Sequence, residues 1–146
     1  MPTHPELELD NQLCFSLYRA SRAVIRAYRP LLKGLGLTYP QYLVMLVLWQ
    51  CDEGIGVKRI GDELGLDSGT LTPLLRRLER SGYVTRTRDD ADERRALIAL
   101  TETGRALRED AAGIPDELNR LYADCEVDAD GLKVQLDILG KHLPSA

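Results

Sequence analysis

The sequence is poor in the residues that build disulfide frameworks and metal centres. It has three cysteines and two histidines in 146 residues. Cys14, Cys51 and Cys125 are far apart and odd in number, which argues against a disulfide framework and for a reducing compartment. With only His4 and His142 as imidazole ligands, no zinc site or catalytic His/Cys cluster is expected. The sequence therefore predicts a protein without a metal or another cofactor.

Long apolar runs are also missing. The longest, Tyr42 to Trp49, has eight residues, which is too short for a membrane span and typical of a buried helix. The first twelve residues lack a basic region followed by a hydrophobic core, so no signal peptide is expected. The balance of 44% hydrophobic and 29% charged residues is that of a soluble globular domain. We therefore expect a cytoplasmic protein with no membrane partner.

The chain as a whole has no excess of positive charge, but one segment of it does. The net charge is −4, yet five arginines accompany a single acid, Glu79, between Thr70 and Arg88. From Glu109 to the end, nine acids stand against three Lys and Arg residues. A DNA-binding face needs local positive charge rather than a basic protein. The middle of the chain is therefore the candidate nucleic-acid surface.

Apolar residues recur with helical spacing over residues 10–33, and either Asp10 or Asn11 is expected to cap this helix. Thr38 and Gln41 have the spacing of a capping box, which predicts a second, buried helix that ends near residue 50.

The middle of the chain predicts two more helices and a hairpin. A short helix ends at Gly65, and a second runs from Gly69 to Ser81. The segments Tyr83–Arg88 and Arg95–Leu100 alternate like two strands of a hairpin. A helix-turn-helix followed by a hairpin is the winged-helix arrangement, in which the second helix enters the major groove of DNA.

The last part of the chain predicts further helices. Thr101 is expected to cap a long helix that Pro115 bends or interrupts, and a final helix runs from Asp130 to His142. The predicted fold class is mainly α (α+β), in one domain over 1–146. Within it, the sequence predicts terminal helices for dimerisation at 10–50 and 102–146, and a winged helix-turn-helix over 54–101. The terminal helices are too apolar for one winged domain to cover, so a homodimer is expected.

The second helix of the pair and the hairpin hold the candidate DNA contacts. Small and hydroxyl side chains at the start of the helix let backbone N–H groups approach a phosphate or a base edge. Arginines further along suit phosphate contacts or guanine readout, and an aspartate at the hairpin turn can hold an arginine that enters a minor groove. The plainer interpretation is a solvated charged face, but helix and hairpin together favour DNA. The candidates are Ser68, Gly69, Thr70, Thr72, Arg76, Arg77, Arg80, Arg86, Arg88, Asp92 and Arg94.

These residues carry a resemblance to a known family. The run from Gly56 to Gly104, which contains LDSGTLTPLLRRLERSGYVTRTRDDADERRALIALTETG, resembles the winged-helix core of the MarR family of bacterial transcription regulators. The wing motif D-x-R of that family is matched by Asp92-Glu93-Arg94. The stretches LCFSLYRASR and TYPQYLVMLVLW, with Tyr28, resemble the organic-hydroperoxide-sensing branch. The resemblance implies a homodimeric repressor that binds a palindromic operator in double-stranded DNA and is released by an organic hydroperoxide.

Cys14 allows two interpretations. It stands near a helix start, where the helix dipole favours a thiolate, and Tyr18 lies one turn further on. Taken alone, these facts favour an inert core residue, as most buried cysteines are. The resemblance implies instead that Cys14 is the peroxide-reactive thiol, held across the dimer by Tyr28 and Tyr39, with Tyr18 as a possible further contact.

The resemblance also implies a second thiol. Cys125 is the candidate resolving cysteine of the partner subunit, and a mixed disulfide between Cys14 and a small thiol is the alternative. Cys51, at the end of an apolar helix, is expected in the core.

Two other functions remain open from the sequence. Tyr18, Tyr28, Tyr39 and Tyr42 could line a pocket for a phenolic or aromatic ligand that releases the repressor. A thiol peroxidase that consumes the hydroperoxide is the remote alternative. The chain offers no pocket motif for repeated turnover, so the sequence favours a regulator over an enzyme.

Overall fold

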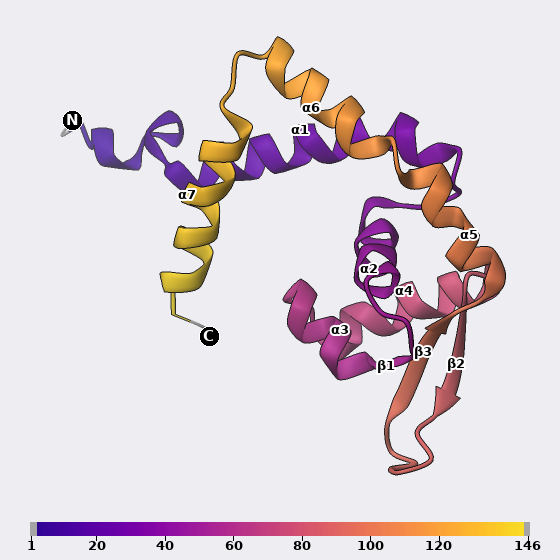
Figure 1. Ribbon diagram of the computed structural model, residues 1–146. Helices are drawn as coiled ribbons and strands as arrows, with labels where there is room; N and C mark the ends of the chain where they lie inside the picture. The colour runs from indigo at the N-terminus through magenta and orange to yellow at the C-terminus, as the bar shows by residue number, and fades with distance from the viewer. Residues whose placement is uncertain (1–2, 145–146) are drawn as a thin grey trace. The chain divides into compact units, whose positions relative to one another are not determined.

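The computed structural model describes residues 3–144 (Figure 1). The chain divides into two compact units with the boundary between Ala111 and Ala112. The first unit holds η1 (Pro5–Leu7), η2 (Leu9–Asn11), α1 (Leu13–Lys33), α2 (Tyr39–Trp49), β1 (Ile55–Gly56), α3 (Val57–Leu64), α4 (Ser68–Arg80), β2 (Val84–Arg88), β3 (Ala96–Leu100) and α5 (Glu102–Ala111). The second unit holds α6 (Ile114–Asp124) and α7 (Ala129–His142).

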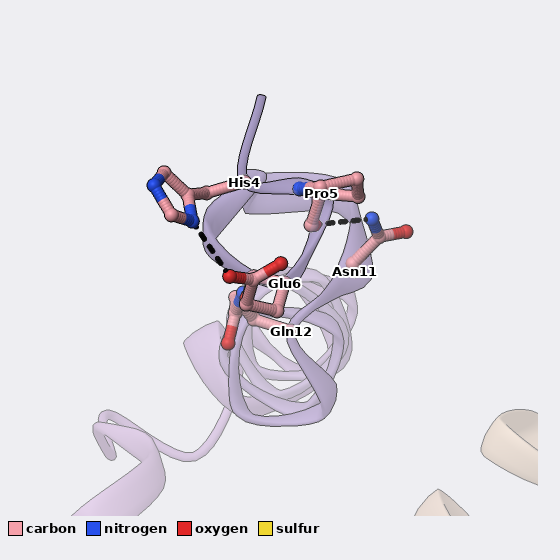
Figure 2. A network of polar contacts seen from close by, with 5 residues as sticks. All are labelled: His4, Pro5, Glu6, Asn11 and Gln12. Carbon is pink, nitrogen blue, oxygen red and sulfur yellow. Dashed lines mark hydrogen bonds and ion pairs between the residues drawn. The ribbon is translucent and has the colours of Figure 1, made fainter. Parts of the chain in front are cut away.

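The start of α1 differs from the prediction. Its N-cap is Gln12, with no side-chain capping bond, so the expectation that Asp10 or Asn11 caps this helix is wrong. The amide side chains of Asn11 and Gln12 instead donate to backbone carbonyl groups of the preceding residues. Asn11 Nδ2 donates to Pro5 O at 2.7 Å (Figure 2). Gln12 Nε2 donates to Glu6 O at 2.8 Å.

The start of α2 follows the prediction. The Thr38 side chain accepts a hydrogen bond from the Gln41 backbone, and Gln41 Oε1 accepts one from the Thr38 N–H at 2.9 Å. This reciprocal pair is the capping box, which satisfies two N–H groups that the helix itself leaves unpaired. Because apolar residues surround α2, it is the most buried helix of the first unit.

The helix-turn-helix forms for local reasons that the sequence shows. Gly65 ends α3 in the left-handed conformation with φ 67°, which glycine adopts without steric cost. Asp67 then caps α4 by accepting the Thr70 N–H at 2.7 Å. One stripe of α4 is buried and anchors it on the core; it consists of Leu71, Leu74, Leu75 and Leu78.

The hairpin is part of a three-stranded antiparallel sheet. The strand order is β1-β3-β2, with Val84 opposite Leu100 and Arg88 opposite Ala96. The short β1 pairs its Ile55 with Ile98 on the other edge of β3. The buried side chain of Ile98 holds this sheet on the helices, and the hairpin extends beyond them as the wing (Figure 1).

The predicted long C-terminal helix is interrupted, and Pro115 lies in the first turn of the second part, α6. Thr101 Oγ1 accepts the Gly104 N–H at 3.0 Å and so caps α5, as predicted. The helix α5, grouped by sequence with the dimerisation helices, packs against α2 and β3 in the first unit. The final helix, α7, has no buried residue.

The core of the first unit lies between α2, α3, α4 and the sheet. Its most buried large side chains include Met45, Ile60, Leu71 and Leu78, all fully inaccessible. Within residues 3–144, no helix combines the length and the hydropathy that a membrane crossing requires. The same residues hold no group of three His, Cys, Asp or Glu that could bind a metal ion.

Candidate DNA-binding surface and thiol site

Arginines from α4 and from both sides of the wing surround one hollow of about 440 Å³. Arg76 reaches it from α4, and Arg86 and Arg88 reach it from β2. Because residues two apart on a strand share a face, the alternation of β2 brings the last two together, as the sequence predicts. The remaining lining residues are Thr87, Glu93, Arg94, Arg95 and Ala96. Five arginines against one glutamate make this surface a phosphate-binding candidate.

The wing turn is built by two aspartates. Asp89 Oδ1 accepts the Ala91 N–H at 3.0 Å, and Asp92 Oδ1 accepts the Arg94 N–H at 3.1 Å. Such side-chain turns fix the backbone of a loop. The Asp92 carboxylate approaches Nε of Arg95 at 3.6 Å. It therefore positions Arg94 through the backbone, while its ion pair is with Arg95.

Sequence reasoning missed Arg95. The signal was present in the adjacent arginines of the segment Glu93-Arg94-Arg95, but the sequence analysis named only Arg94 of the D-x-R motif. In the structure, Arg95 both forms the ion pair with Asp92 and lines the hollow.

The other predicted DNA contacts lie on the same helix, outside the hollow. The first turn of α4 exposes Ser68, Gly69 and Thr70, while Thr72 is half-buried. The Thr70 hydrogen bonds lower the pKa of the Asp67 carboxyl below its ordinary value of 3.8. Arg77 and Arg80 are exposed on the last turns of α4. The helix therefore presents a polar N-terminal turn and a basic C-terminal half.

Cys14 is exposed, in the first turn of α1. Within a single chain Cys14 is therefore not a core residue, and the interpretation as an inert buried cysteine is wrong at that level. Around it, the rings of Phe15 and Tyr18 lie under the guanidinium groups of Arg19 and Arg22, at 5.6 and 5.5 Å. The helix has five basic residues and no acid.

Tyr28 and Tyr39 come together on α1 and α2, with ring centroids 4.8 Å apart. Tyr42 joins them at 5.7 Å from the Tyr28 ring. Burial, and then the neighbouring Tyr39, raise the pKa of the Tyr42 phenol above its ordinary value. Tyr18 is exposed one turn from Cys14 and is not part of this cluster. We call Tyr28, Tyr39 and Tyr42 the tyrosine cluster.

The tyrosine cluster and Cys14 are separated within one chain. Cys14 and Tyr28 are fourteen positions apart on α1, which corresponds to about 21 Å along a helix axis. The Tyr28 phenol of the same chain therefore cannot reach the sulfur of Cys14.

The other two cysteines differ in their surroundings. Cys51 was expected in the core but is only half-buried, just after α2, and its thiol donates to Val47 O at 3.5 Å. Cys125 is exposed at the end of α6, just before Glu126, which adopts a positive φ of 58°.

Comparisons with known proteins decide the family. Residues 26–111 match the family described as transcriptional regulator SarA/Rot. The chain is 48% identical over 130 residues to the organic hydroperoxide resistance transcriptional regulator of Bacillus subtilis, which covers 89% of this chain and 88% of that protein. The chain belongs to the SarA/Rot group of the MarR family of winged-helix transcriptional regulators.

Solved structures support the same assignment. The structure of reduced AbfR bound to DNA, a protein of Staphylococcus epidermidis, is 37% identical, covers 95% of this chain and 97% of that one, and gives a TM-score of 0.72. A disulfide form of AbfR is 41% identical over 88% and 92% of the two chains, with a TM-score of 0.64. A MarR-family regulator from Rhodococcus is 29% identical over 95% and 98%, with a TM-score of 0.78. As a MarR-family member, the chain is a DNA-binding regulator rather than an enzyme.

Proposed function

We propose that this MarR-family regulator is a homodimeric, cytoplasmic repressor that leaves its palindromic operator when an organic hydroperoxide oxidises Cys14. The observation that carries the proposal is the position of Cys14. Its thiol is exposed in the first turn of α1, on a helix with five basic residues and no acid. The similarity to a Bacillus regulator of organic hydroperoxide resistance and to AbfR supports it.

The dimer follows from where the chain exposes large apolar side chains. They lie only before residue 19 and after residue 120 among the described residues, and none lies in between: Leu7, Leu9, Leu13, Tyr18, Leu121, Val127, Leu132, Val134, Leu136, Ile138 and Leu143. Each of the two units exposes several large apolar side chains, and exposure of this kind is typical of an interface. A second copy of the chain is the proposed cover.

The dimer also completes the thiol site. Because Tyr28 of the same chain lies about 21 Å from Cys14, we assign the phenol contacts to Tyr28 of the partner subunit and Tyr39 of the partner subunit. A phenol O–H can donate to a thiolate and accept from a sulfenic acid. Tyr18, one turn from Cys14, offers its exposed ring to the organic group of the peroxide.

The chemical step is a two-electron oxidation of sulfur. The Cys14 thiolate attacks one peroxide oxygen, an S–O bond forms, and the O–O bond breaks. The terminal OH of the peroxide stays on the sulfur, which becomes a sulfenic acid, and the departing alkoxide takes a proton from water to become an alcohol. Partial positive charge at the N-terminus of α1 and the cations of this helix stabilise the negative charge on the sulfur and the leaving oxygen.

DNA binding uses the surface described above. The first turn of α4 enters the major groove, where backbone N–H groups and Ser68, Thr70 and Thr72 meet base edges and phosphates. The hollow holds phosphates with Arg76, Arg86 and Arg88. Arg94 at the wing tip enters the minor groove, with Asp92 fixing its backbone. In a dimer, two recognition helices about 34 Å apart match successive turns of DNA.

The sulfenic acid then condenses with a second thiol and releases water. Cys125 of the partner subunit is one source, and its exposure at the end of α6 supports it. A small thiol is the other source. A non-reducing gel after peroxide treatment decides between them. A cross-linked dimer that disappears in Cys125→Ser identifies Cys125, and a monomer band with the mass of a small-thiol adduct identifies the alternative.

The test of the proposal is operator binding by fluorescence anisotropy, with and without a small excess of cumene hydroperoxide. Wild type is expected to release DNA and to rebind after dithiothreitol. Cys14→Ser should bind equally well and ignore the peroxide, and Cys51→Ser, the matched control, should behave like wild type. Release of Cys14→Ser by peroxide contradicts the assignment. Release of both proteins by a salicylate-like compound without oxidation would favour the ligand-released alternative, for which the tyrosine cluster supplies the rings.

A further inference from the structure

Tyr83 joins three parts of the first unit through three hydrogen bonds. Its N–H donates to Leu78 O at 3.0 Å, which ties it to the end of α4. Its carbonyl accepts the Thr101 N–H at 3.0 Å, at the junction of β3 and α5. Its hydroxyl donates to Leu35 O at 2.9 Å, in the loop that leads into α2. The residue after it, Val84, begins β2, so Tyr83 stands where the wing leaves the recognition helix.

Trp49 makes a second connection to the same place. Its buried Nε1–H donates to Gly104 O of α5 at 2.9 Å. Gly104 in turn packs directly on Tyr83. A Cβ added at Gly104 would clash with the backbone carbonyl of Tyr83, so no other residue fits without moving the backbone. The indole of α2 and the base of the wing are therefore held in one fixed arrangement through α5.

Both connections begin at the tyrosine cluster. The Trp49 ring lies 6.3 Å from that of Tyr42 in an edge-on orientation, and Tyr42 contacts Tyr28 and Tyr39. The loop bonded by the Tyr83 hydroxyl, residues 34–38, leads directly to Tyr39 through the Thr38 cap. Packed interiors shift as units rather than deforming gradually, so a displacement of the cluster acts on both connections.

We propose that Trp49 and Tyr83 are positioning residues that couple the tyrosine cluster to the recognition helix and wing. The inference rests on the proposed function, because it describes how oxidation at Cys14 changes DNA binding. When the phenols lose their contact with the Cys14 sulfur, the cluster moves. The Trp49 and Tyr83 hydrogen bonds then transfer that movement to α5, the wing base and the end of α4.

The test compares operator affinity before and after oxidation. The measured quantity is the ratio of the Kd of the oxidised protein to the Kd of the reduced protein, with Cys14 oxidation checked by intact-mass spectrometry. Tyr83→Phe removes one oxygen and one hydrogen bond, and Trp49→Phe removes the N–H donor while keeping an aromatic ring. Because a net hydrogen bond corresponds to about a three- to tenfold change in an equilibrium constant, each variant should lower the ratio by roughly that factor. Tyr122→Phe, in the second unit, is the matched control and should leave it unchanged.

The outcomes separate coupling from a merely structural role. If Tyr83→Phe weakens binding equally in both redox states, the ratio stays constant and the inference is overturned. If wild type itself does not release DNA although Cys14 is oxidised, the proposed function is contradicted, and the inference that rests on it is contradicted too. Tyr83→Phe alone is sufficient should Trp49→Phe fail to fold.

Trp49 provides an independent measurement because it is the only tryptophan of the chain. Its emission reports the environment of the indole directly. Peroxide should change the emission of wild type at the same rate as Cys14 oxidation and leave Cys14→Ser unchanged. An unchanged emission during full release of DNA would also overturn the inference.

Discussion

The recognition helix α4 and the last helix α7 have nearly the same length but opposite surroundings. Of the 13 residues of α4, four leucines are buried by the same chain. Of the 14 residues of α7, none is buried, although Leu132, Val134, Leu136 and Ile138 are all at least 39% exposed. The winged helix is complete in one chain, whereas the terminal helices need another surface. Cys14, exposed on α1, belongs to the part that a single chain leaves incomplete.

The largest expected effect comes from a substitution in α7, the helix that its own chain leaves exposed. Leu136→Asp places a charge on the surface that we assign to the partner, so the dimer should dissociate in analytical ultracentrifugation. Operator affinity should fall by about 10²–10⁴-fold, since two linked half-site contacts become one. The neighbouring Gln135→Asp is the control and should remain dimeric. A Leu136→Asp dimer with normal affinity would contradict the role of α7.

A second substitution tests α4, the helix that is buried by residues of its own chain. Leu75 of α4 is 1% exposed, and Leu75→Ala leaves a cavity in the core of the first unit. We expect the free energy of unfolding to fall by about 2–5 kcal/mol, measured by urea denaturation at a fixed protein concentration. The native variant should remain a dimer. A loss below about 1 kcal/mol would show that α4 is held by something other than its leucine stripe.

A third prediction separates the DNA surface from general charge. Arg86→Ala removes one cation from the hollow, so operator affinity should fall about tenfold. The slope of log Kd against log salt should fall by about 1. Arg120→Ala, which removes an arginine paired with Glu117 at 2.7 Å in α6, should change neither quantity. Equal effects of both variants would remove the hollow from the DNA interface.

The smallest expected effect concerns pH. The hydrogen bonds from Thr70 lower the pKa of the Asp67 carboxyl in the folded protein, so its ionised form stabilises the start of α4. This contribution is complete above the ordinary pKa of 3.8 and is lost as pH falls through the folded pKa. Asp67→Asn keeps a capping oxygen but cannot titrate. The difference in urea midpoint between wild type and Asp67→Asn should shrink below pH 3.8 and stay constant above it.

The sequence predicted the elements whose cause is local. The Thr38 capping box, the Gly65 turn and the hairpin strands depend on residues within a few positions of one another, and all were found as expected. The predicted cap of α1 was wrong because the side chains of Asn11 and Gln12 donate to carbonyls of the preceding 3-10 turns. The apolar periodicity of the sequence does not indicate these contacts.

The candidate site shows the same division. Alternation on β2 predicted that Arg86 and Arg88 share a face, whereas the position of Arg76 beside them is known only from the structure. Arg95 was missed because the motif singled out Arg94, whereas Arg95 pairs with Asp92 and lines the hollow as well. The hydrogen bond from Trp49 to Gly104 joins residues 55 positions apart, and nothing local in the sequence indicates it. The roles of Cys14, Tyr28, Tyr39 and Cys125 stay predictions until the experiments above are done.

The strand order β1-β3-β2 has one more consequence. It leaves β2 at an edge of the sheet, and an open edge is a template for pairing with another chain. Four of its five residues are exposed, and two of them are Arg86 and Arg88. Two edge strands of this kind would bring like charges together, so their repulsion opposes wing-to-wing aggregation while the regulator is free of DNA. The arginines that we assign to DNA phosphates thus also oppose pairing of the β2 edge with another chain when no DNA is bound.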